Sequence, residues 1–462
     1  MKGASSAKIG LEIHGYLTTK EKLFCRCPAN YKTAQINSNI CPICTGQPGS
    51  KPMAPNEEAM KKVIAISLML GCKINPQVIW QRKHYDWPDM PKGYQSTISG
   101  AHAVPVAVKG EFQGIGITEA HLEEDPARWD PATGNVDYNR CGVPLIEIVT
   151  DPDFKDSETV KDWVNQLVLT LSYIGAVDAD AGIKADVNVS VFEGRQGKRV
   201  EVKNINSVDS IVRAIEYEIK RQKEVLRGGQ EVIMETRTFI DETGETVSMR
   251  SKENAADYRF ISDPDLPTID ISKAQVETIK KSLPELPHIK VQRFIKQHKL
   301  DSDTAAVLTA NIDIANFFEK VLDQVKDVKL ASVWVTIELL RVLNYNKKKL
   351  SEVDVKVEHF VSLLNAVKQG KLTELAGKRM LNEFIPKSFD PSAQLKTSER
   401  ITDKTQIEKW CKETISKNKE AAEDYKKGEE KSLNFLMGEV IKLSSRRADS
   451  KIVREVLVKL IK

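Results

Sequence analysis

The 462-residue sequence lacks the features that would place it in several large classes of protein. Its longest strongly apolar runs, such as Val63–Leu70, are far shorter than the about 20 residues needed to cross a bilayer. Its first residues, MKGASSAK, contain no apolar segment of the kind found in export signals. There is no Walker A motif, no Rossmann glycine fingerprint and no nucleophile elbow. We therefore expect a cytoplasmic protein without a membrane partner, and any ATP chemistry must use another scaffold.

An excess of one charge is also nearly absent. The formal net charge is +4, and hydrophobic and charged residues make up 41% and 29% of the chain, as in folded globular proteins. The whole excess lies in residues 401–462, which hold 15 Lys and Arg against 11 Asp and Glu. This weakly basic end is compatible with contact to nucleic acid, and equally with an ordinary solvated helical surface.

A chain of this length is expected to form two or three domains. Strand-like and helix-like patterns alternate over the first 270 residues, so we expect a mixed domain of helices and strands (α+β) over residues 1–288. Residues 289–395 are Lys-rich and helical in pattern, Pro386–Ser398 is typical of a linker, and residues 396–462 predict a small helical tail. The clearest individual elements are strands at Ile9–His14 and Leu145–Val149, hairpin arms at Ile183–Val191 and Arg199–Lys203, and helices at 56–70 and 160–174.

The sharpest local signal is a pair of cysteine knuckles, Cys25-x-Cys27 and Cys41-x-x-Cys44. Four thiolates at this spacing can close a tetrahedral shell around zinc, although the first pair is one residue tighter than usual. A closed shell leaves no open position, so we expect a structural zinc. The alternative is four unrelated buried cysteines. Either interpretation indicates a reducing compartment, because the chain has seven cysteines, an odd number.

Acidic residues recur beside apolar segments. Glu12 and His14 are two apart on a predicted strand and share a face, and Glu147 is the only acid in an apolar run. A buried carboxylate must be paired or bind a metal. Oxygen ligands together with one imidazole suit Mg²⁺ or Mn²⁺, so these residues could share a metal site. The alternative is that each acid forms its own salt bridge, for example Glu147 with Arg140. The further candidates are Glu123, Glu124 and Asp186.

A third group of residues mixes cations with aromatics in a loop-like stretch from Arg82 to Gln95. Such a stretch is suited to a nucleotide or a tRNA end through charge and stacking, and an ordinary surface loop has the same composition.

Taken in order, these segments closely resemble the GatB/GatE family, the B-type subunits of tRNA-dependent amidotransferases and their archaeal relatives. The sequence after DPDLP leaves no room for a large insert, and in this respect the chain resembles B-type rather than E-type proteins. The departures are Pro126-Ala127-Arg128 in place of Ala-Gly-Lys, and His84 in place of Asn. Besides the cysteine pairs, the motifs are IGLEIH (Ile9–His14), RKHYDWPDMPKGYQ (Arg82–Gln95), HLEEDP (His121–Pro126), NRCGVPLIEIVTDPD (Asn139–Asp153), KADVNVS (Lys184–Ser190), EVKNINS (Glu201–Ser207), DYRFISDPDLP (Asp257–Pro267) and the YqeY-like tail Asn434–Ile461.

The resemblance implies a cradle-shaped catalytic domain built on an antiparallel sheet with flanking helices, then a helical domain and a YqeY-like tail. It also implies a ligase reaction in which ATP phosphorylates the Glu or Asp side chain of a mischarged tRNA. Ammonia then displaces the phosphate; it is supplied from glutamine by an A-type amidase subunit, in a complex that also holds a small C-type subunit. Whether Glu-tRNA(Gln) or Asp-tRNA(Asn) is the substrate stays open. The two amino acids differ by one methylene group, and a binding site distinguishes such a difference only weakly.

The resemblance also implies roles for individual residues. It places Glu12, His14, Glu124 and Glu147 around Mg²⁺, with Glu123 and Asp186 as neighbouring acids. The nucleotide contacts that it implies are Arg82, Lys83, Lys203, Asn206 and Ser207, and the tRNA contacts are Arg446, Arg447 and Lys451. Two other functions stay open: a non-catalytic, zinc-stapled tRNA adaptor, and a stand-alone metal-dependent phosphohydrolase.

Overall fold

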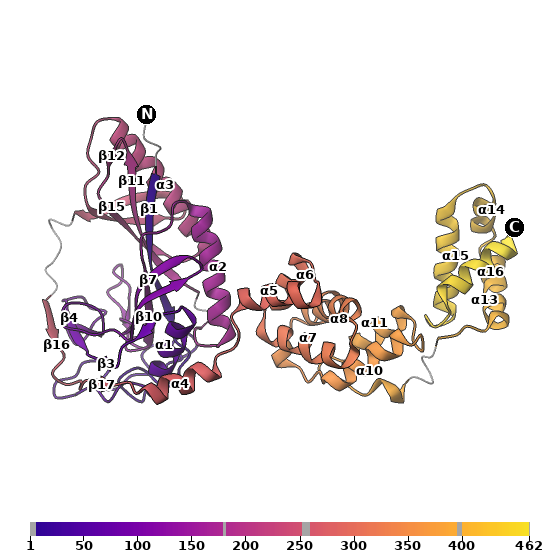
Figure 1. Cartoon of the computed structure of the whole chain (residues 1–462), viewed down its shortest axis with the longest axis horizontal. Coiled ribbons are helices and arrows are strands. Elements are labelled where there is room, and N and C mark those ends of the chain that lie inside the picture. Colours follow the sequence, from indigo (N-terminus) through magenta and orange to yellow (C-terminus); the bar gives the residue numbers. More distant parts are fainter. Residues whose placement is uncertain (1–5, 179–181, 252–258, 395–399, 462) are drawn as a thin grey trace. The chain divides into compact units, whose positions relative to one another are not determined.

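The structure, a computed structural model, describes residues 6–178, 182–251, 259–394 and 400–461 (Figure 1). The chain divides into two compact units, Met1–His288 and Ile289–Lys462. Part of the predicted linker (residues 395–399) and the start of the motif at Asp257–Pro267 lie outside the described residues. Across the described ranges, each helix is too short or too polar to span a membrane.

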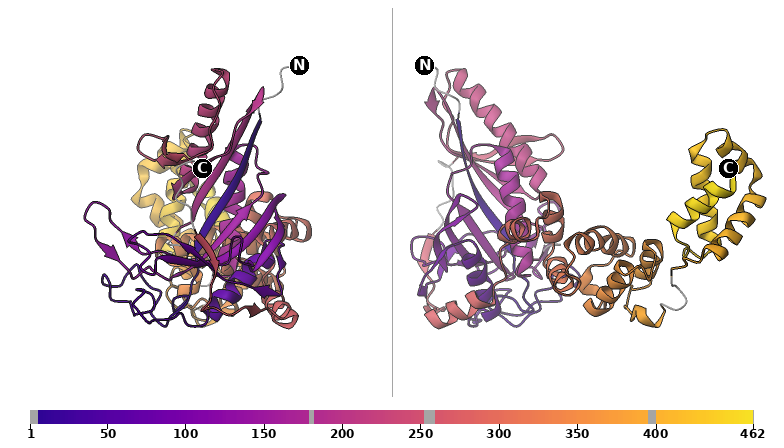
Figure 2. Two further views of the ribbon diagram at one scale, coloured as in Figure 1. Left: turned by 90° about the vertical axis from the view of Figure 1, so that its left-hand side faces the viewer. Right: turned by 45° about the vertical axis from the view of Figure 1, so that its right-hand side comes forward.

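The first unit is built on a large, mainly antiparallel sheet with 13 strands among the described residues (Figure 2). Its path from one edge to the other is β15 (Glu245–Ser251), β14 (Glu235–Ile240), β13 (Val200–Ile205), β11 (Lys184–Glu193), β1 (Ser6–Tyr16), β10 (Pro144–Thr150), β7 (Ile115–Glu124), β5 (Tyr94–Thr97), β4 (Gln81–His84) and β16 (Arg259–Ser262). The remaining strands are β2 (Lys73–Ile74), β6 (Ala107–Phe112) and β12 (Arg195–Gln196) beside this path, and the separate pairs β3 (Gln77–Val78) with β17 (Ile269–Asp270) and β8 (Arg128–Trp129) with β9 (Val136–Asp137).

Helices cover the apolar face of this sheet. Ile9, Leu11 and Ile13 of β1 are at most 1% exposed and join one core with residues of the helices. Successive strand residues point to opposite faces, so the polar residues between them face away from the helices. The helices of this unit are α1 (Glu57–Met69), α2 (Ser157–Tyr173), α3 (Val208–Arg227) and α4 (Lys273–Ser282).

The predicted secondary structure of this unit is confirmed in its main features. Asn56 caps α1 by accepting from the amides of Glu58 and Ala59. The predicted hairpin pairs β11 with β13 in antiparallel register. One feature was not predicted: β13 and β14 are parallel, with α3 lying between them in the sequence. A parallel neighbour requires such a crossover, which places α3 against β11.

The second unit is helical, as predicted, and its described residues form two separate apolar cores. The division of this unit into a helical domain and a tail stays a prediction. Its longer helices are α5 (Pro287–His298), α6 (Ser302–Thr309), α7 (Ile312–Val325), α8 (Val328–Val333), the π-helix η3 (Trp334–Leu339), α9 (Leu340–Tyr345), α10 (Val357–Lys368), α11 (Glu374–Asn382), α13 (Lys404–Lys417), α14 (Lys419–Lys426), α15 (Glu430–Leu443) and α16 (Ser450–Ile461).

Candidate active site

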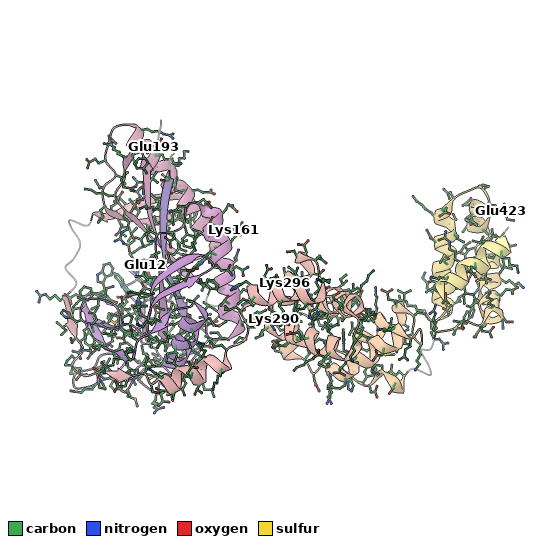
Figure 3. The ribbon with its side chains drawn as sticks, in the orientation of Figure 1. Glu12, Lys161, Glu193, Lys290, Lys296 and Glu423 are labelled. Carbon is green, nitrogen blue, oxygen red and sulfur yellow. The ribbon has the colours of Figure 1, made fainter. Side chains whose placement is uncertain are left out.

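Several polar side chains lie on the sheet face that points away from the helices, and one of them is Glu12 of β1, labelled in Figure 3. The strand pairing sets His14 opposite Glu147 of β10, and Glu12 opposite Asp186 of β11. Glu147 in turn lies opposite His121 of β7. Directly opposed residues project to the same face, so segments far apart in the sequence bring their polar groups together here.

The first of two acidic groups on this face consists of His14, Glu123 and Glu147. One ligand atom of each lies within 4.8 Å of the others, and His14 Nε2 is 3.3 Å from Glu147 Oε2. Burial opposes protonation of His14, but its hydrogen bond with Glu147 prevails and raises its pKa to about 9. Burial and the charge of Glu147 raise the pKa of Glu123. The group therefore holds two carboxylates close together with little solvent, an arrangement that a cation would stabilise.

The second group consists of Glu12, Asp186 and Glu201, whose ligand atoms also lie within 4.8 Å of one another. Lys203 bridges two of these acids: its Nζ contacts Asp186 and lies 2.9 Å from Glu201 Oε1. Burial and the charge of Glu147 raise the pKa of Glu12. One lysine thus faces three carboxylates, and the two acidic groups influence one another electrostatically.

The chemistry of these donors fits divalent cations. Five carboxylates and one imidazole form the two groups, which is the ligand type that Mg²⁺ and Mn²⁺ prefer. Asn188 Nδ2 donates to Glu12 Oε1 at 3.0 Å, while its buried Oδ1 has no hydrogen-bond partner in the described part of the chain. A buried acceptor without a partner is costly, so it too is available to a cation or its water.

Glu124 lies elsewhere, in contrast to its predicted place around Mg²⁺. It is not in either metal-capable group of the described residues, where Glu123 occurs instead. Glu124 is 2% exposed; its carboxylate contacts Lys92 and accepts from the Ser96 amide at 2.8 Å. The reason is the alternation of a strand: neighbours on β7 point to opposite faces, so only one of them can join His14.

The same alternation separates the predicted nucleotide contacts Arg82 and Lys83. Arg82 pairs with Asp263 at 3.1 Å and with Asp265 at 2.5 Å. Lys83 lies near the first acidic group, where its charge acts to lower the pKa of Glu123 against the larger effect of burial.

Arg140 does not pair with Glu147, the partner considered from the sequence. Its Nε lies 2.7 Å from Asp125 Oδ2 and donates to the Pro126 carbonyl at 2.9 Å. Glu147 is instead held by two imidazoles, those of His14 and His121.

Asn206 and Ser207, two further predicted nucleotide contacts, directly follow β13, the strand that carries the predicted contact Lys203. Ser207 caps α3 by accepting from the Ser210 amide at 3.0 Å. Both residues line a cavity of about 250 Å³ together with apolar residues of α2 such as Val164 and Leu171. Since Ser207 is used as a helix cap, its role toward a nucleotide has no support from this geometry.

Two residues of the site were overlooked in the sequence. Glu201 begins the EVKNINS motif and lies between Val200 and Val202, so its place beside Lys203 on the polar face was a usable signal. His121 begins the HLEEDP motif, but nothing local indicates that it meets Glu147. That contact depends on the register of β7 against β10.

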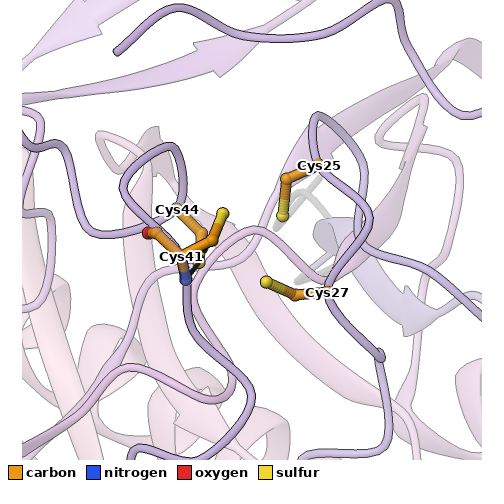
Figure 4. Close-up of side chains that lie close together, drawn as sticks. All are labelled: Cys25, Cys27, Cys41 and Cys44. Carbon is orange, nitrogen blue, oxygen red and sulfur yellow. Dashed lines mark hydrogen bonds between the residues drawn. The ribbon is translucent and has the colours of Figure 1, made fainter. Parts of the chain in front are cut away.

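The four cysteines form a separate cluster. The pair Cys25 and Cys27 faces the pair Cys41 and Cys44 (Figure 4), and the four Sγ atoms lie within 4.8 Å of one another. Cys41 and Cys44 are 3.9 Å apart at sulfur, and all four thiols are free. Four thiolates at such distances are placed to hold a metal such as zinc.

A buried cation, Lys22, stands beside this cluster. It is 1% exposed, its Nζ lies 3.5 Å from Cys44 Sγ, and it donates to the Tyr138 carbonyl at 3.1 Å. The hydrogen bond from Cys25 and the charge of Lys22 lower the pKa of Cys44 to about 5, although burial acts against this. Lys22 would thus offset part of the negative charge of four thiolates if they held a metal such as zinc.

Two of the predicted tRNA contacts, Arg446 and Arg447, lie in the turn between α15 and α16, and Lys451 lies in the first turn of α16. Arg446 and Lys451 are exposed, and Arg447 is half-buried with its carbonyl accepting from the Ile401 amide at 2.9 Å. The structure brings the three residues into one short segment and assigns them no ligand.

Comparison with known proteins identifies the family. Residues 7–277 match the family described as GatB/GatE catalytic domain, and residues 316–461 match the GatB domain. The chain is 44% identical over 467 residues (99% of the chain, 98% of the relative) to a Methanococcus maripaludis protein, named as the B subunit of aspartyl/glutamyl-tRNA(Asn/Gln) amidotransferase. Proteins of the same name from Methanocaldococcus jannaschii and Methanopyrus kandleri are 43% and 41% identical, over 97% and 98% of this chain and equal shares of their own lengths.

Proposed function

The chain belongs to the GatB/GatE family of amidotransferase B subunits, and from this membership we propose that it is part of an ATP-dependent ligase that acts on mischarged tRNA. In this proposal it phosphorylates the side-chain carboxylate of Glu on tRNA(Gln), or of Asp on tRNA(Asn). It then passes the activated side chain to ammonia.

The observation that carries the proposal is the pair of acidic groups on one sheet face. Glu12 and His14 are two residues apart on β1, and each belongs to a different group. Cations bound to the two groups would be neighbours. Adjacent divalent sites beside a lysine are suited to holding a triphosphate and neutralising the charge that moves with its terminal phosphoryl group.

The residues of the chain would divide the work as follows. Mg²⁺, when bound, would supply charge neutralisation at the phosphate oxygens of ATP. Lys203 would hold Asp186 and Glu201 in place, and Lys83 would offer a cation to the phosphates from the side of Glu123. The proposed metal-binding residues are His14, Glu123 and Glu147 for one cation, and Glu12, Asp186 and Glu201 for the other.

The chemistry explains why ATP is required. A free carboxylate is a very poor electrophile for ammonia. Attack of a carboxylate oxygen on the terminal phosphorus of ATP forms the acyl phosphate and releases ADP. Ammonia then forms the amide bond at the acyl carbon, loses a proton and expels phosphate, a good leaving group.

The remaining features complete the proposal. We expect the four-cysteine cluster to hold a structural zinc, because a closed thiolate shell offers no open position. The A-type amidase subunit would release ammonia from glutamine, and the small C-type subunit would complete a cytoplasmic heterotrimer. The helical region would contact tRNA largely through phosphates, with Arg446, Arg447 and Lys451 as candidates.

The decisive experiment measures ADP release by the chain reconstituted with its two partner subunits. Uncharged tRNA, Glu-tRNA and Asp-tRNA are compared for the wild type, Glu147→Gln and the control Glu193→Gln. Glu193 is on the same sheet, pairs with Arg227 at 3.1 Å and lies seven residues beyond Asp186 on β11 (Figure 3), roughly 23 Å along the strand. We expect release that depends on a mischarged tRNA, a fall of at least about 100-fold in Glu147→Gln, and no change in the control.

Other results would favour the competing functions. Full ADP release by Glu147→Gln with intact tRNA binding, measured by filter retention, would favour a tRNA adaptor with chemistry elsewhere. ADP release by the single chain, indifferent to tRNA and partners, would favour a phosphohydrolase. Dependence on Glu-tRNA or Asp-tRNA alone would identify the substrate.

A further inference from the structure

A second row of polar side chains lies behind the first acidic group, on β7. His121 is 2% exposed and stands opposite Glu147 in the strand register. Its Nε2 is 3.1 Å from Glu147 Oε2, and its Nδ1 is 3.3 Å from Glu119 Oε1. Ser99 donates its hydroxyl to the same oxygen of Glu119. A continuous polar chain therefore runs from Glu147 away from the proposed metal.

The contacts of Glu147 explain what this chain can do. His14 Nε2 and His121 Nε2 both approach the same carboxylate oxygen, Oε2, at 3.3 Å and 3.1 Å. Two donors from strands on either side of β10 fix the rotation of the carboxylate. The second oxygen, Oε1, is then left for a cation.

His121 itself is unsuited to direct chemistry. It is too buried to meet a substrate, and it does not belong to either metal-capable group of the described residues. Its Nε2 is hydrogen-bonded to Glu147, and its Nδ1 lies 3.3 Å from Glu119 Oε1 in an ionic contact without hydrogen-bond geometry, so carboxylates flank the ring on two sides. Residues that orient a metal ligand in this way typically change metal affinity about 10–100-fold when they are removed.

We propose that His121 is a positioning residue, which donates a hydrogen bond from Nε2 to Glu147 and so holds this carboxylate for the divalent cation. The carboxylate of Glu119, 3.3 Å from Nδ1, would support the ring by its charge from the other side. The inference rests on the proposed function, because it assumes that Glu147 binds a metal.

The test measures Mn²⁺ binding to the full chain by electron paramagnetic resonance, without ATP or tRNA. His121→Leu removes the donor, whereas His121→Gln keeps an N–H near the position of Nε2. Glu147→Gln removes the proposed ligand, and the melting temperature without metal is recorded for each variant. We expect the Mn²⁺ affinity of His121→Leu to fall about 10–100-fold and that of His121→Gln to stay within about threefold of the wild type.

The outcomes separate this inference from the proposed function. The positioning role is overturned, and the metal site stands, if Glu147→Gln abolishes Mn²⁺ binding while His121→Leu binds Mn²⁺ like the wild type. The same conclusion follows if His121→Gln binds Mn²⁺ as weakly as His121→Leu does. If wild type binds no Mn²⁺, or Glu147→Gln binds it equally well, both are overturned. If His121→Leu fails to fold, Glu119→Gln provides the test. A lower Mn²⁺ affinity of this variant at an unchanged melting temperature supports the positioning role, and an unchanged Mn²⁺ affinity overturns it.

Discussion

The cysteine cluster and the acidic face are two candidate ligand sets in the same unit, and they are built in opposite ways. The cysteines come from two loops between Cys25 and Cys44 and so lie close together in the sequence. The acidic face takes its ligands from β1, β7, β10, β11 and β13, so it spans the chain from Glu12 to Glu201. A local ligand set can close on its metal and hold loops together, whereas an assembled one can leave room for a substrate.

This difference predicts different responses to substitution. Four thiolates leave no open position around zinc, so removing them should act on the fold. The acidic groups bring like charges together at the expense of stability, as functional sites commonly do, so removing one of them should act on chemistry. The following experiments test this contrast.

The largest effect on stability is expected from the double substitution Cys41→Ser and Cys44→Ser. Losing two of four ligands should release the metal and lower the free energy of unfolding by about 4 kcal/mol or more, because metal binding is coupled to folding of the loops. Zinc content and urea denaturation measure this. Prolonged treatment of the wild type with a chelator should reproduce the loss; full stability of a zinc-free protein would show that the cluster is not structural.

An intermediate effect is expected from Glu124→Gln, compared with its neighbour Glu123→Gln. Glu124 is buried against Lys92, so its neutralisation should leave a buried cation without its partner and cost about 3 kcal/mol. Glu123 is crowded by Glu147, so Glu123→Gln should keep or raise stability while ADP release falls at least about 100-fold. Thermal denaturation and the ADP assay on both variants provide the comparison.

This adjacent pair also checks the register of β7. If Glu124→Gln were stable and inactive while Glu123→Gln were active, the faces of β7 would be assigned the wrong way round. Equal behaviour of the two variants would mean that the strand's alternation does not divide structural from metal-binding roles.

The smallest effect is expected from Lys22→Met, which keeps the length of the side chain and removes its charge. The variant should stay folded, because the apolar stem is retained, but bind zinc about tenfold more weakly than the wild type. Competition with a zinc-chelating dye measures the affinity. Lys51→Met, at an exposed lysine that pairs with Asp265 at 2.7 Å, is the matched control.

Much of this unit followed from local patterns. The cap at Asn56, the arms of the β11–β13 hairpin and the cysteine pairs depend on residues close in the sequence, and the structure contains each of them. The shared face of Glu12 and His14 also followed from the two-residue period of a strand.

Other features could not be derived from local patterns. Glu123 and Glu124 are equivalent until the start and register of β7 are known, and the family resemblance assigned Glu124 to the metal. Nothing in the sequence around His121 indicates its contact with Glu147. Ser207 shows the opposite case. Its motif suggested a nucleotide contact, whereas in the structure the residue caps a helix.

The sequence by itself determined the family, the helix and strand periods and the cysteine cluster, because each is written in short-range spacing. The tertiary structure decided which acids meet, which of two adjacent glutamates faces the site, and what stands behind Glu147. The physical reason is that strand pairing joins residues far apart in the chain, and a shift of one residue turns every side chain to the other face.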